Sequence, residues 1–381
     1  MPSRLSAAAR LKGGYGYSPE RPCMKEPRGP RRQRNVPTIS DVAAQAGVSP
    51  MTVSRVINGE SNVRDDTRRR VEEAIAALNY APNAAARTLA GGDDIRIGLL
   101  HSNPSFAYLS EFLVGSLDQA SRSNVHLVVE KCDDDGGEAA AVDHLLRGRI
   151  DGVVLPPPLS DSLPILSALE ARGIPVVAVA TGRAPDWALS VSIDDRQAAY
   201  DMTRHLIQLG HVRIGFITGN PNQTASAERL DGYRAALNDA GLTTGSELVA
   251  EGMFTYRSGL DAADLLLDSA DPPTAIFAAN DDMAAATVAI AHRKGLDVPG
   301  DLTVCGFDDT ALATTIWPEL TTIRQPVIEM SRRAVELLVR TIRNGKASAA
   351  DQPAHVLADY ELIRRQSDAA PRRRPAARKP G

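Results

Sequence analysis

Residues 38–58, TISDVAAQAGVSPMTVSRVIN, constrain the fold most, because they predict two short helices joined by a tight turn. Apolar residues recur at helical spacing up to Gly47, where a chain leaving a helix needs a positive φ. Ser49 is a natural N-cap, and Pro50 suits the first helical position, where its missing N–H is not needed. We therefore predict one helix ending before Gly47 and a second beginning at Pro50.

The second helix is predicted to have an apolar and a polar side. Val53, Val56 and Ile57 can face inward. The outward residues are then Met51, Thr52, Ser54 and Arg55. This is the layout of a recognition helix in a DNA-binding helix-turn-helix. An ordinary hairpin of a helical bundle would show the same pattern, so the assignment depends on the rest of the chain.

Three further segments surround the helix pair. Residues 65–79 predict a third helix with one apolar face, which would complete a small headpiece of about 45 residues. Residues 82–92 predict a helix of about two turns, too short to persist alone in water. They form either a hinge that folds on binding or an alanine-rich linker. Residues 1–36 are rich in Gly, Pro and Arg and predict a flexible basic arm.

Short apolar runs alternate with helical patterns from Ile95 onward. The runs start on average about 30 residues apart, the length of one β-α repeat. This spacing predicts two parallel sheets of four strands, each with helices on both faces. One doubly wound sheet of eight strands is the alternative. The extended stretches at 191–195 and 320–326 indicate crossovers and favour two lobes.

Charge is unevenly distributed within a net charge of −4. Residues 1–90 contain 15 Lys and Arg against 8 Asp and Glu, whereas residues 91–365 contain 23 against 38. A basic headpiece suits attraction to phosphates, although a solvated charged face is the simpler alternative. The sequence shows no membrane span, no signal-peptide core and no paired cysteine motif. We expect a cytoplasmic protein with no membrane contact, metal or cofactor.

The order of these segments resembles LacI-type (LacI/GalR) bacterial transcriptional regulators. The resemblance rests on TISDVAAQAGVSPMTVSRVIN, on TRRRVEEAIAALNYAPNAAARTLAGG and on the body that follows, and it covers residues 37–365. It implies a multidomain fold in which an all-α helix-turn-helix headpiece precedes a two-lobed, periplasmic-binding-protein-like α/β sensor with parallel sheets. The expected parts are the arm at 1–36, headpiece at 37–81, hinge at 82–92, sensor and dimerisation domain at 93–366, and a disordered basic tail at 367–381.

The family resemblance implies a homodimeric repressor of a near-palindromic double-stranded DNA operator, controlled allosterically by a small molecule, commonly a sugar. Met51 and Arg55 would then contact bases, and Leu89 would insert into the minor groove. The full set of expected DNA contacts is Thr38, Ser49, Pro50, Met51, Thr52, Ser54, Arg55, Asn58, Asn83, Ala86 and Leu89. One departure is Arg64, where the family often has a Ser that caps the third helix.

The resemblance also implies effector contacts at the carboxyl ends of strands, in a cleft between the lobes. The expected contacts are Ser102, Tyr108, Arg229, Phe254, Asn280 and Asp308. Arg229 could equally be a helix salt-bridge residue, and Phe254 a core residue. Asp281 and Asp309 are expected to cap helices or loops. An acid-rich cleft with one arginine favours a neutral sugar over a phosphorylated one.

Other patterns predict no further chemistry. The DDDGGE stretch at 133–138 lacks the ligand spacing of a calcium loop and indicates a turn. His205 and His211 would not share one helix face, which argues against a metal site. The chain shows no serine elbow, paired catalytic carboxylates or Walker loop, so we do not expect an enzyme. A solute-binding protein or an α/β enzyme with the same body fold is the alternative reading.

Overall fold

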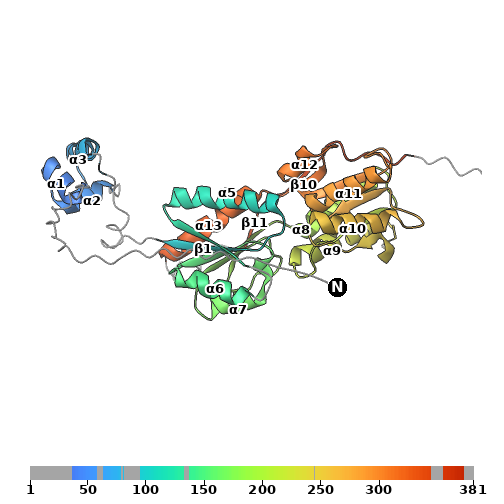
Figure 1. Ribbon diagram of the computed structural model, residues 1–381, viewed down its shortest axis with the longest axis horizontal. Helices are drawn as coiled ribbons and strands as arrows, with labels where there is room; N and C mark the ends of the chain where they lie inside the picture. The colour runs from blue at the N-terminus through green and yellow to red at the C-terminus, as the bar shows by residue number, and fades with distance from the viewer. Residues whose placement is uncertain are drawn as a thin grey trace, which may run out of the picture. The chain divides into compact units, whose positions relative to one another are not determined.

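The chain divides into two compact units, Met1–Gly92 and Asp93–Gly381. The computed structural model describes residues 37–57, 63–78, 80, 95–132, 137–243, 245–344 and 355–372. No helix among these residues is long and apolar enough to cross a membrane. The first unit contains the helices α1 (Ile39–Ala46), α2 (Pro50–Ile57) and α3 (Asp65–Leu78) (Figure 1).

The predicted helix-turn-helix is confirmed, with Gly47 and Ser49 in the expected places, and the structure adds a cap at the start of α1. Thr38 and Asp41 form a capping box at the start of α1, in which the Asp41 carboxylate accepts the Thr38 N–H at 2.7 Å. Gly47 ends α1 with a φ of 65°. The Ser49 hydroxyl accepts the N–H of Thr52 at 3.2 Å and so caps α2. These local bonds fix where each helix begins and ends.

The headpiece has its own small core, built from all three helices. Val42, Val53 and Val71 are fully buried in it, one from each helix. Arg64 occupies the N-cap position of α3, since its carbonyl accepts the Arg68 N–H at 3.0 Å, and two aspartates follow it in the first turn. α3 therefore begins at residue 65, as predicted, although Arg64 stands where the family often has a serine.

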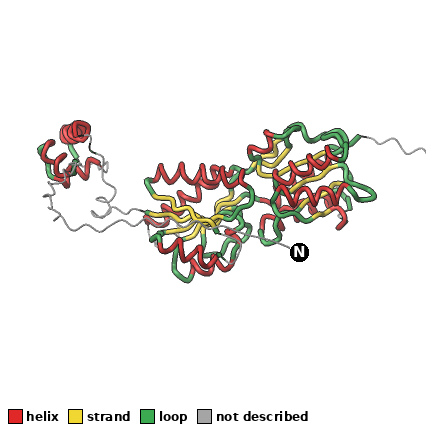
Figure 2. The backbone as a smooth tube through the Cα atoms, in the orientation of Figure 1, coloured by secondary structure: helices red, strands yellow, loops and turns green. Residues whose placement is uncertain are grey.

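The second unit contains two six-stranded sheets, which confirms two lobes and excludes the single sheet (Figure 2). The strand orders are β11-β5-β4-β3-β1-β2 and β12-β10-β9-β8-β6-β7, and every pairing is parallel except that of β10 with β12. The first lobe contains β1 (Arg96–His101), β2 (His126–Lys131), β3 (Gly152–Leu155), β4 (Val176–Val179), β5 (Leu189–Ser192) and β11 (His355–Leu357). The second lobe contains β6 (Ile214–Ile217), β7 (Val249–Ala250), β8 (Ala275–Ala278), β9 (Thr303–Asp308), β10 (Thr321–Arg324) and β12 (Glu361–Ile363).

The prediction of four strands per sheet was too low, because segments assigned to crossovers also pair as strands. The stretch at 191–195 continues from β5, and the stretch at 320–326 contains β10. A third crossing, between β11 and β12, adds one strand to each sheet. The lobes are thus joined by three short segments, the arrangement that lets two rigid lobes move about a hinge.

Helices cover both sheets (Figure 1). Those of the first lobe are α5 (Phe106–Ser123), α6 (Glu138–Arg147), α7 (Leu163–Glu170) and α13 (Val327–Asn344), with the short helix η1 (Leu159–Asp161). Those of the second lobe are α8 (Asp195–Gln208), α9 (Thr224–Asp239), α10 (Tyr256–Leu267), α11 (Asp281–Arg293) and α12 (Ala311–Thr315), with the short helix η2 (Ser246–Leu248). The pairs α5–α13, α8–α9 and α10–α11 pack against each other.

The predicted disordered tail from residue 367 is wrong for its first six residues. Ser367 and Asp368 are buried against the second lobe. The Ser367 hydroxyl donates to the Val304 carbonyl, and Asp368 pairs with His205 at 2.8 Å. Polar and backbone hydrogen bonds, rather than apolar contacts, hold this segment. Its sequence therefore shows no apolar periodicity from which an ordered structure could be predicted. Residues 373–381 lie outside the described residues.

The close crossing of α5 and α13 gives a test of this packing. A Cβ at Gly115 would lie 2.0 Å from Ser331 Oγ and 2.2 Å from the Ile328 carbonyl oxygen. We expect Gly115→Ala to lower the free energy of unfolding by about 1–3 kcal/mol, because backbone must move to make room. Urea unfolding measures this, with Ser110→Ala on the exposed side of α5 as the control. Equal stability of the two variants would contradict the packing.

Candidate functional site

The outward side of α2 presents the side chains expected to contact DNA. Met51 is 65% exposed, Arg55 is exposed, and Thr52 and Ser54 are half-buried. Pro50 begins the helix and is exposed. Free N–H groups at a helix start attract phosphate oxygens. Asn58, Asn83, Ala86 and Leu89, the remaining expected contacts of the turn and hinge, lie outside the described residues.

Two of the expected DNA contacts also shape the helices. Thr38 holds the capping box of α1, and Ser49 caps α2 while its hydroxyl lies 3.0 Å from that of Thr52. Their side chains are thereby fixed at the two helix starts. The headpiece thus carries a pre-shaped polar surface around an exposed methionine and an exposed arginine.

The second unit has a cleft of about 410 Å³, open solvent at its mouth included, between the two lobes. Its lining comes from strand ends and helix starts of both lobes: Asn103, Pro104, Ser105, Tyr108, Pro157, Ala180, Gln223, Ala225, Arg229, Phe254, Asn280, Asp308 and Gln325. Five of the six residues expected to contact an effector line it. Ser102 does not; it directly follows β1, and the next turn brings Asn103 and Ser105 to the cleft instead.

Arg229 is the central cation of the cleft and is only 4% exposed. Its Nε donates to Asp195 Oδ1 at 2.8 Å, and its Nη1 donates to the Ala279 carbonyl at 2.5 Å and lies 3.8 Å from Asp308 Oδ1. The guanidinium stacks over the Phe307 ring at 3.6 Å from its centroid. The salt bridge weighed as an alternative role therefore exists, and it holds the guanidinium at the cleft.

Two buried carboxylates share this single guanidinium. Burial raises the pKa of Asp195 despite the opposing effect of Arg229. Burial likewise raises the pKa of Asp308 to about 7, against the lowering effects of Arg229 and of a hydrogen bond from Gln325 Nε2 at 2.6 Å. Desolvation outweighs pairing because one cation cannot neutralise two buried anions. The cleft therefore carries a surplus of acceptor oxygens.

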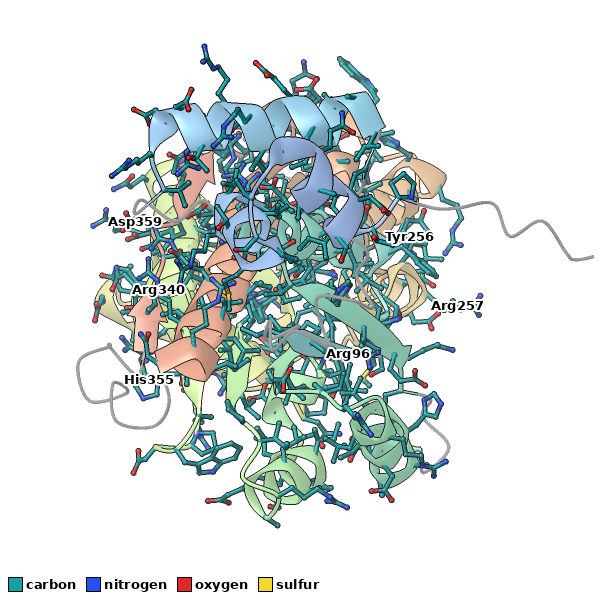
Figure 3. All side chains as sticks on the ribbon, turned by 90° about the vertical axis from the view of Figure 1, so that its left-hand side faces the viewer. Arg96, Tyr256, Arg257, Arg340, His355 and Asp359 are labelled. Atoms are coloured by element: carbon teal, nitrogen blue, oxygen red, sulfur yellow. The ribbon has the colours of Figure 1, made fainter. Side chains whose placement is uncertain are left out.

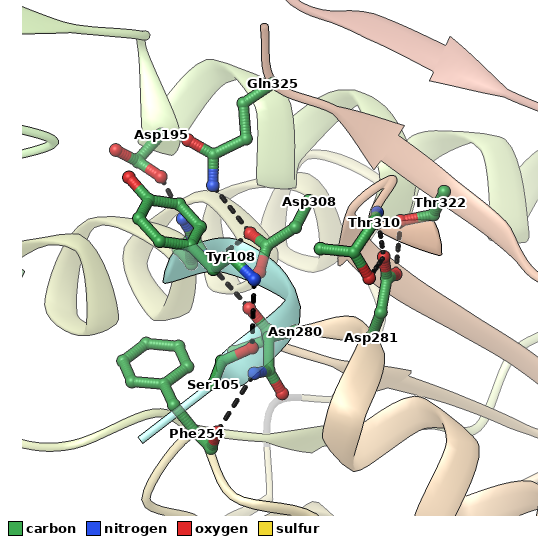
Figure 4. A network of polar contacts seen from close by, with 12 residues as sticks. Ser105, Tyr108, Asp195, Phe254, Asn280, Asp281, Asp308, Thr310, Thr322 and Gln325 are labelled. Carbon is green, nitrogen blue, oxygen red and sulfur yellow. Dashed lines mark hydrogen bonds and ion pairs between the residues drawn. The ribbon is translucent and has the colours of Figure 1, made fainter. Parts of the chain in front are cut away.

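Asn280 and Asp281 follow β8, and Asn280 lines the cleft as expected, but it is also the residue that caps α11. Asn280 itself caps α11, since its Oδ1 accepts the Met283 N–H at 3.0 Å while its Nδ2 donates to the Phe254 carbonyl at 3.1 Å. Asp281 is fully buried and accepts bonds from Thr310 and Thr322. A residue just past a strand can thus cap a helix and face the cleft, which spacing alone does not distinguish (Figure 4).

Phe254 is both a core residue and a lining residue of the cleft. It belongs to the large core of the second unit and also lines the cleft. Its backbone has a φ of 58°, and its ring lies so close to Gly219 that a Cβ there would come within 1.9 Å of it. Asp308 likewise has a φ of 112°. Unfavourable backbone angles at two cleft residues are typical of binding sites.

Two buried polar atoms in the cleft have no hydrogen-bond partner among the described residues. They are the Tyr108 hydroxyl and Gln325 Oε1. Burial of an unpaired polar atom is costly, so each is a position where a ligand would gain by supplying a partner. Gln325 Oε1 can only accept, which adds to the surplus of acceptors around Asp308. The cleft suits a neutral ligand rich in hydrogen-bond donors.

Several residues that line the cleft or bind its lining residues were not predicted from the sequence. Asp195 and Gln325 lie in the two stretches recognised as crossovers, VSIDD and LTTIRQP, but treated only as connections. Crossovers of a two-lobed protein pass the cleft, so their polar residues could have been nominated on that ground. Gln223, at the start of α9, had no comparable signal.

The other patterns form no metal cluster in the parts of the chain that the structure describes. His205 pairs with Asp368, and His211 lies within hydrogen-bond distance of Thr274 and the Ala369 carbonyl. Of the DDDGGE stretch, residues 133–136 lie outside the described residues. Both histidines hold the C-terminal segment on the second lobe.

Both units of the chain are similar to known proteins. A model of "Bacterial regulatory proteins, lacI family" matches residues 38–83, and a model of a "Periplasmic binding protein-like domain" matches residues 203–367. Catabolite control protein A of Priestia megaterium is 35% identical over 307 residues, covering 80% of this chain and 92% of that protein. The transcriptional repressor CytR of Escherichia coli is 33% identical over 343 residues, covering 89% and 98%.

Solved structures are similar over most of the chain. The transcriptional regulator CelR in complex with cellobiose matches with a TM-score of 0.67 and 32% identity, covering 87% of this chain and 100% of that chain. The lac repressor dimer bound to operator and the anti-inducer ONPF matches with a TM-score of 0.71 and 30% identity, covering 87% and 99%. These relatives are transcriptional regulators and not enzymes.

The raised pKa of Asp308 predicts a pH dependence of stability. Between pH 4 and 7 the folded chain keeps a proton on Asp308 that the unfolded chain releases, so stability falls as the pH rises through this window. Asp308→Asn removes this loss. Relative to the wild type, we expect the free energy of unfolding of the variant to rise by on the order of 1 kcal/mol per pH unit in that window. Above pH 7 the difference between the two should stay constant. Urea unfolding at several pH values measures the difference, and a difference independent of pH would contradict the prediction.

Proposed function

Since this chain belongs to the LacI family of bacterial transcriptional regulators, we propose that it is a homodimeric repressor whose operator binding is controlled by a neutral sugar in the cleft. The observation that carries the sugar is that Gln325 Oε1 and the Tyr108 hydroxyl are unpaired beside the Asp195–Arg229–Asp308 cluster. Sugar hydroxyls both donate and accept, so they can pair with all of these groups. The alternatives, a solute-binding protein or an enzyme, leave the DNA-binding headpiece unexplained.

The headpiece would read DNA through α2 in the major groove. Arg55 offers a bidentate donor pair that matches guanine, and Met51 an apolar contact. Thr52 and Ser54 would bind phosphates, with Thr38, Ser49, Pro50 and Asn58 at the margins of the surface. In the hinge, Asn83 and Ala86 would contact the backbone and Leu89 would separate a base step in the minor groove.

A homodimer would place two headpieces on a near-palindromic operator. Exposed apolar side chains on the second unit support pairing with a second copy of the chain. On α5, Val114 and Leu117 are 53% and 54% exposed, and in the second lobe Trp317 is 74% exposed. Val114 and Leu117 lie three residues apart and so share one face of α5, on which a second copy could pack. The lac repressor structure to which this chain is similar is a dimer on its operator.

The cleft is proposed to bind a neutral, hydroxyl-rich ligand, as in the cellobiose complex of the similar regulator CelR. A phosphorylated sugar is disfavoured, because its charge would face Asp308 in the cleft, and the single cation there, Arg229, already pairs with Asp195. Ser102, placed outside the cleft, is not proposed as a contact. Ligand binding would change how the lobes are held together, and that change would reach the hinge and headpiece. Such a regulator would act in the cytoplasm.

Selection of bound duplexes from a random pool, followed by release with a panel of neutral and phosphorylated sugars, tests the proposed function. We expect a two-fold symmetric site to be enriched and a neutral sugar to change the affinity for that site. Enrichment without symmetry would contradict the dimer, and a response restricted to phosphorylated sugars would contradict the ligand class.

Arg55→Ala should relax the preference at one base position in each half-site, at a cost of about 1–3 kcal/mol, because a bidentate base contact is lost. Competition binding with single-base operator variants measures this. Arg69→Ala removes an equal charge from the exposed surface of α3 and serves as the control. If both variants weakened binding to all sequences equally, Arg55 would be a phosphate contact.

Arg229→Lys should weaken sugar binding about tenfold to hundredfold while leaving operator affinity unchanged. A lysine keeps the charge between the carboxylates but loses the planar fork that binds Asp195, the Ala279 carbonyl and a ligand. Calorimetry with the sugar found in the release screen measures it. Arg257→Lys, on the exposed surface of α10, is the matched control (Figure 3). Unchanged sugar affinity would remove Arg229 from the site.

A further inference from the structure

The helix that carries Arg229 has no N-cap of its own. In α9 the N-cap position is occupied by Gln223, whose side chain makes no capping bond. The first N–H groups of a helix are otherwise unsatisfied and need an acceptor. Since Arg229 lies only about one and a half turns further along the same helix, whatever holds the start of α9 also fixes the position of the guanidinium.

The missing cap comes from the other lobe. Asp161, the last residue of η1 in the first lobe, accepts the Thr224 N–H at 3.0 Å with Oδ2. The same carboxylate accepts the Thr224 hydroxyl at 3.0 Å with Oδ1. Thr224 Oγ1 in turn accepts the Gly182 N–H, also from the first lobe, at 2.8 Å. Three hydrogen bonds thus join the start of α9 to the first lobe, and a carboxylate there also complements the positive end of the helix.

Within its own lobe the capping carboxylate is held in place. Thr181 donates its hydroxyl to Asp161 Oδ1 at 2.6 Å and is itself almost fully buried. Asp161 is therefore oriented by first-lobe contacts before it meets α9. Neither Asp161 nor Thr224 lines the cleft. A role for either residue in ligand binding would have to act through the position of α9.

A second contact joins the lobes at the start of another helix. Ser105, which caps α5 in the first lobe, donates its hydroxyl to Asp282 Oδ2 of α11 at 2.6 Å. Asp282 follows directly after Asn280 and Asp281, and Ser105 lines the cleft. The lobes are thus joined at two helix starts in the second lobe, α9 and α11, from which Arg229 and Asn280 reach the cleft.

We propose that Asp161 is a positioning residue that caps α9 from the opposite lobe, so that lobe closure and the placement of Arg229 in the cleft are a single event. When the lobes separate, the start of α9 loses its cap. The closed form is therefore favoured by a contact that no ligand makes, and ligand affinity depends on a residue that the ligand does not touch. This last consequence rests on the proposed function, whereas the effect on lobe closure does not.

The test measures the distance between the lobes in the full-length chain. Spin labels are attached through Glu170→Cys at the end of α7 and Leu265→Cys on α10, both exposed, in a Cys23→Ser background. The other two cysteines, Cys132 and Cys305, are buried. Pulsed electron spin resonance then gives the populations of closed and open forms, with neither DNA nor sugar present, so a failure here is distinct from a failure of the proposed function.

We expect Asp161→Ala to shift the ratio of closed to open forms about five- to tenfold toward open, as for the loss of a helix cap. Asp161→Asn should stay close to wild type, because asparagine caps helices as well as aspartate. Asp186→Ala, an exposed aspartate of the same lobe, is the control for lost charge. Thr224→Ala keeps the backbone bond and should fall between wild type and Asp161→Ala.

Two outcomes would overturn the proposal. One is an Asp161→Ala distance distribution equal to that of the wild type. The other is an Asp161→Asn variant as open as Asp161→Ala, since a merely electrostatic effect of the charge would then explain the shift. Thermal unfolding of each variant separates loss of closure from loss of fold. If Asp161→Ala does not fold, the Thr224→Ala distribution decides, and its identity with the wild type would equally overturn the proposal.

Discussion

The charge cluster of Asp195, Arg229 and Asp308 is the interaction on which the ligand cleft depends. Its members come from α8, α9 and the end of β9, and Asp195 and Arg229 are nearly fully buried. One guanidinium between two carboxylates leaves the cluster incompletely compensated, which is why burial raises the pKa of both acids. A buried, under-compensated cluster contributes little to stability. Its surplus acceptors instead favour a ligand that donates hydrogen bonds.

Around the cluster, polar residues recur at strand ends and helix starts. Ser105, Thr224 and Asn280 each stand where a helix begins at the edge of the cleft. A helix start offers unpaired N–H groups, so a polar side chain there has a bond to make whether or not a ligand is bound. Ser105 and Asn280 also line the cleft, and Ser105 and Thr224 join the two lobes.

Prediction from sequence was most successful where bonds are local. The capping box at Thr38, the left-handed Gly47 and the cap at Ser49 act within a few residues, so the helix-turn-helix could be placed nearly to the residue. The apolar strands also appeared at the expected places. Prediction failed where a partner lies far along the chain. Ser367 and Asp368 were assigned to a disordered tail because their stabilising contacts, Val304 and His205, are distant in sequence.

By itself the sequence determined the order of the domains, the headpiece helices and five of the residues that line the cleft, because periodicity, capping and strand ends are written in neighbouring residues. Only the tertiary structure decided that Ser102 lies outside the cleft, and that Asp195 and Gln325 lie against Arg229 and Asp308. It also decided that Asp161 caps a helix of the opposite lobe. The physical reason is that a buried charge or helix end is satisfied by whichever group the fold brings within about 3 Å, and distance along the chain does not reveal that group.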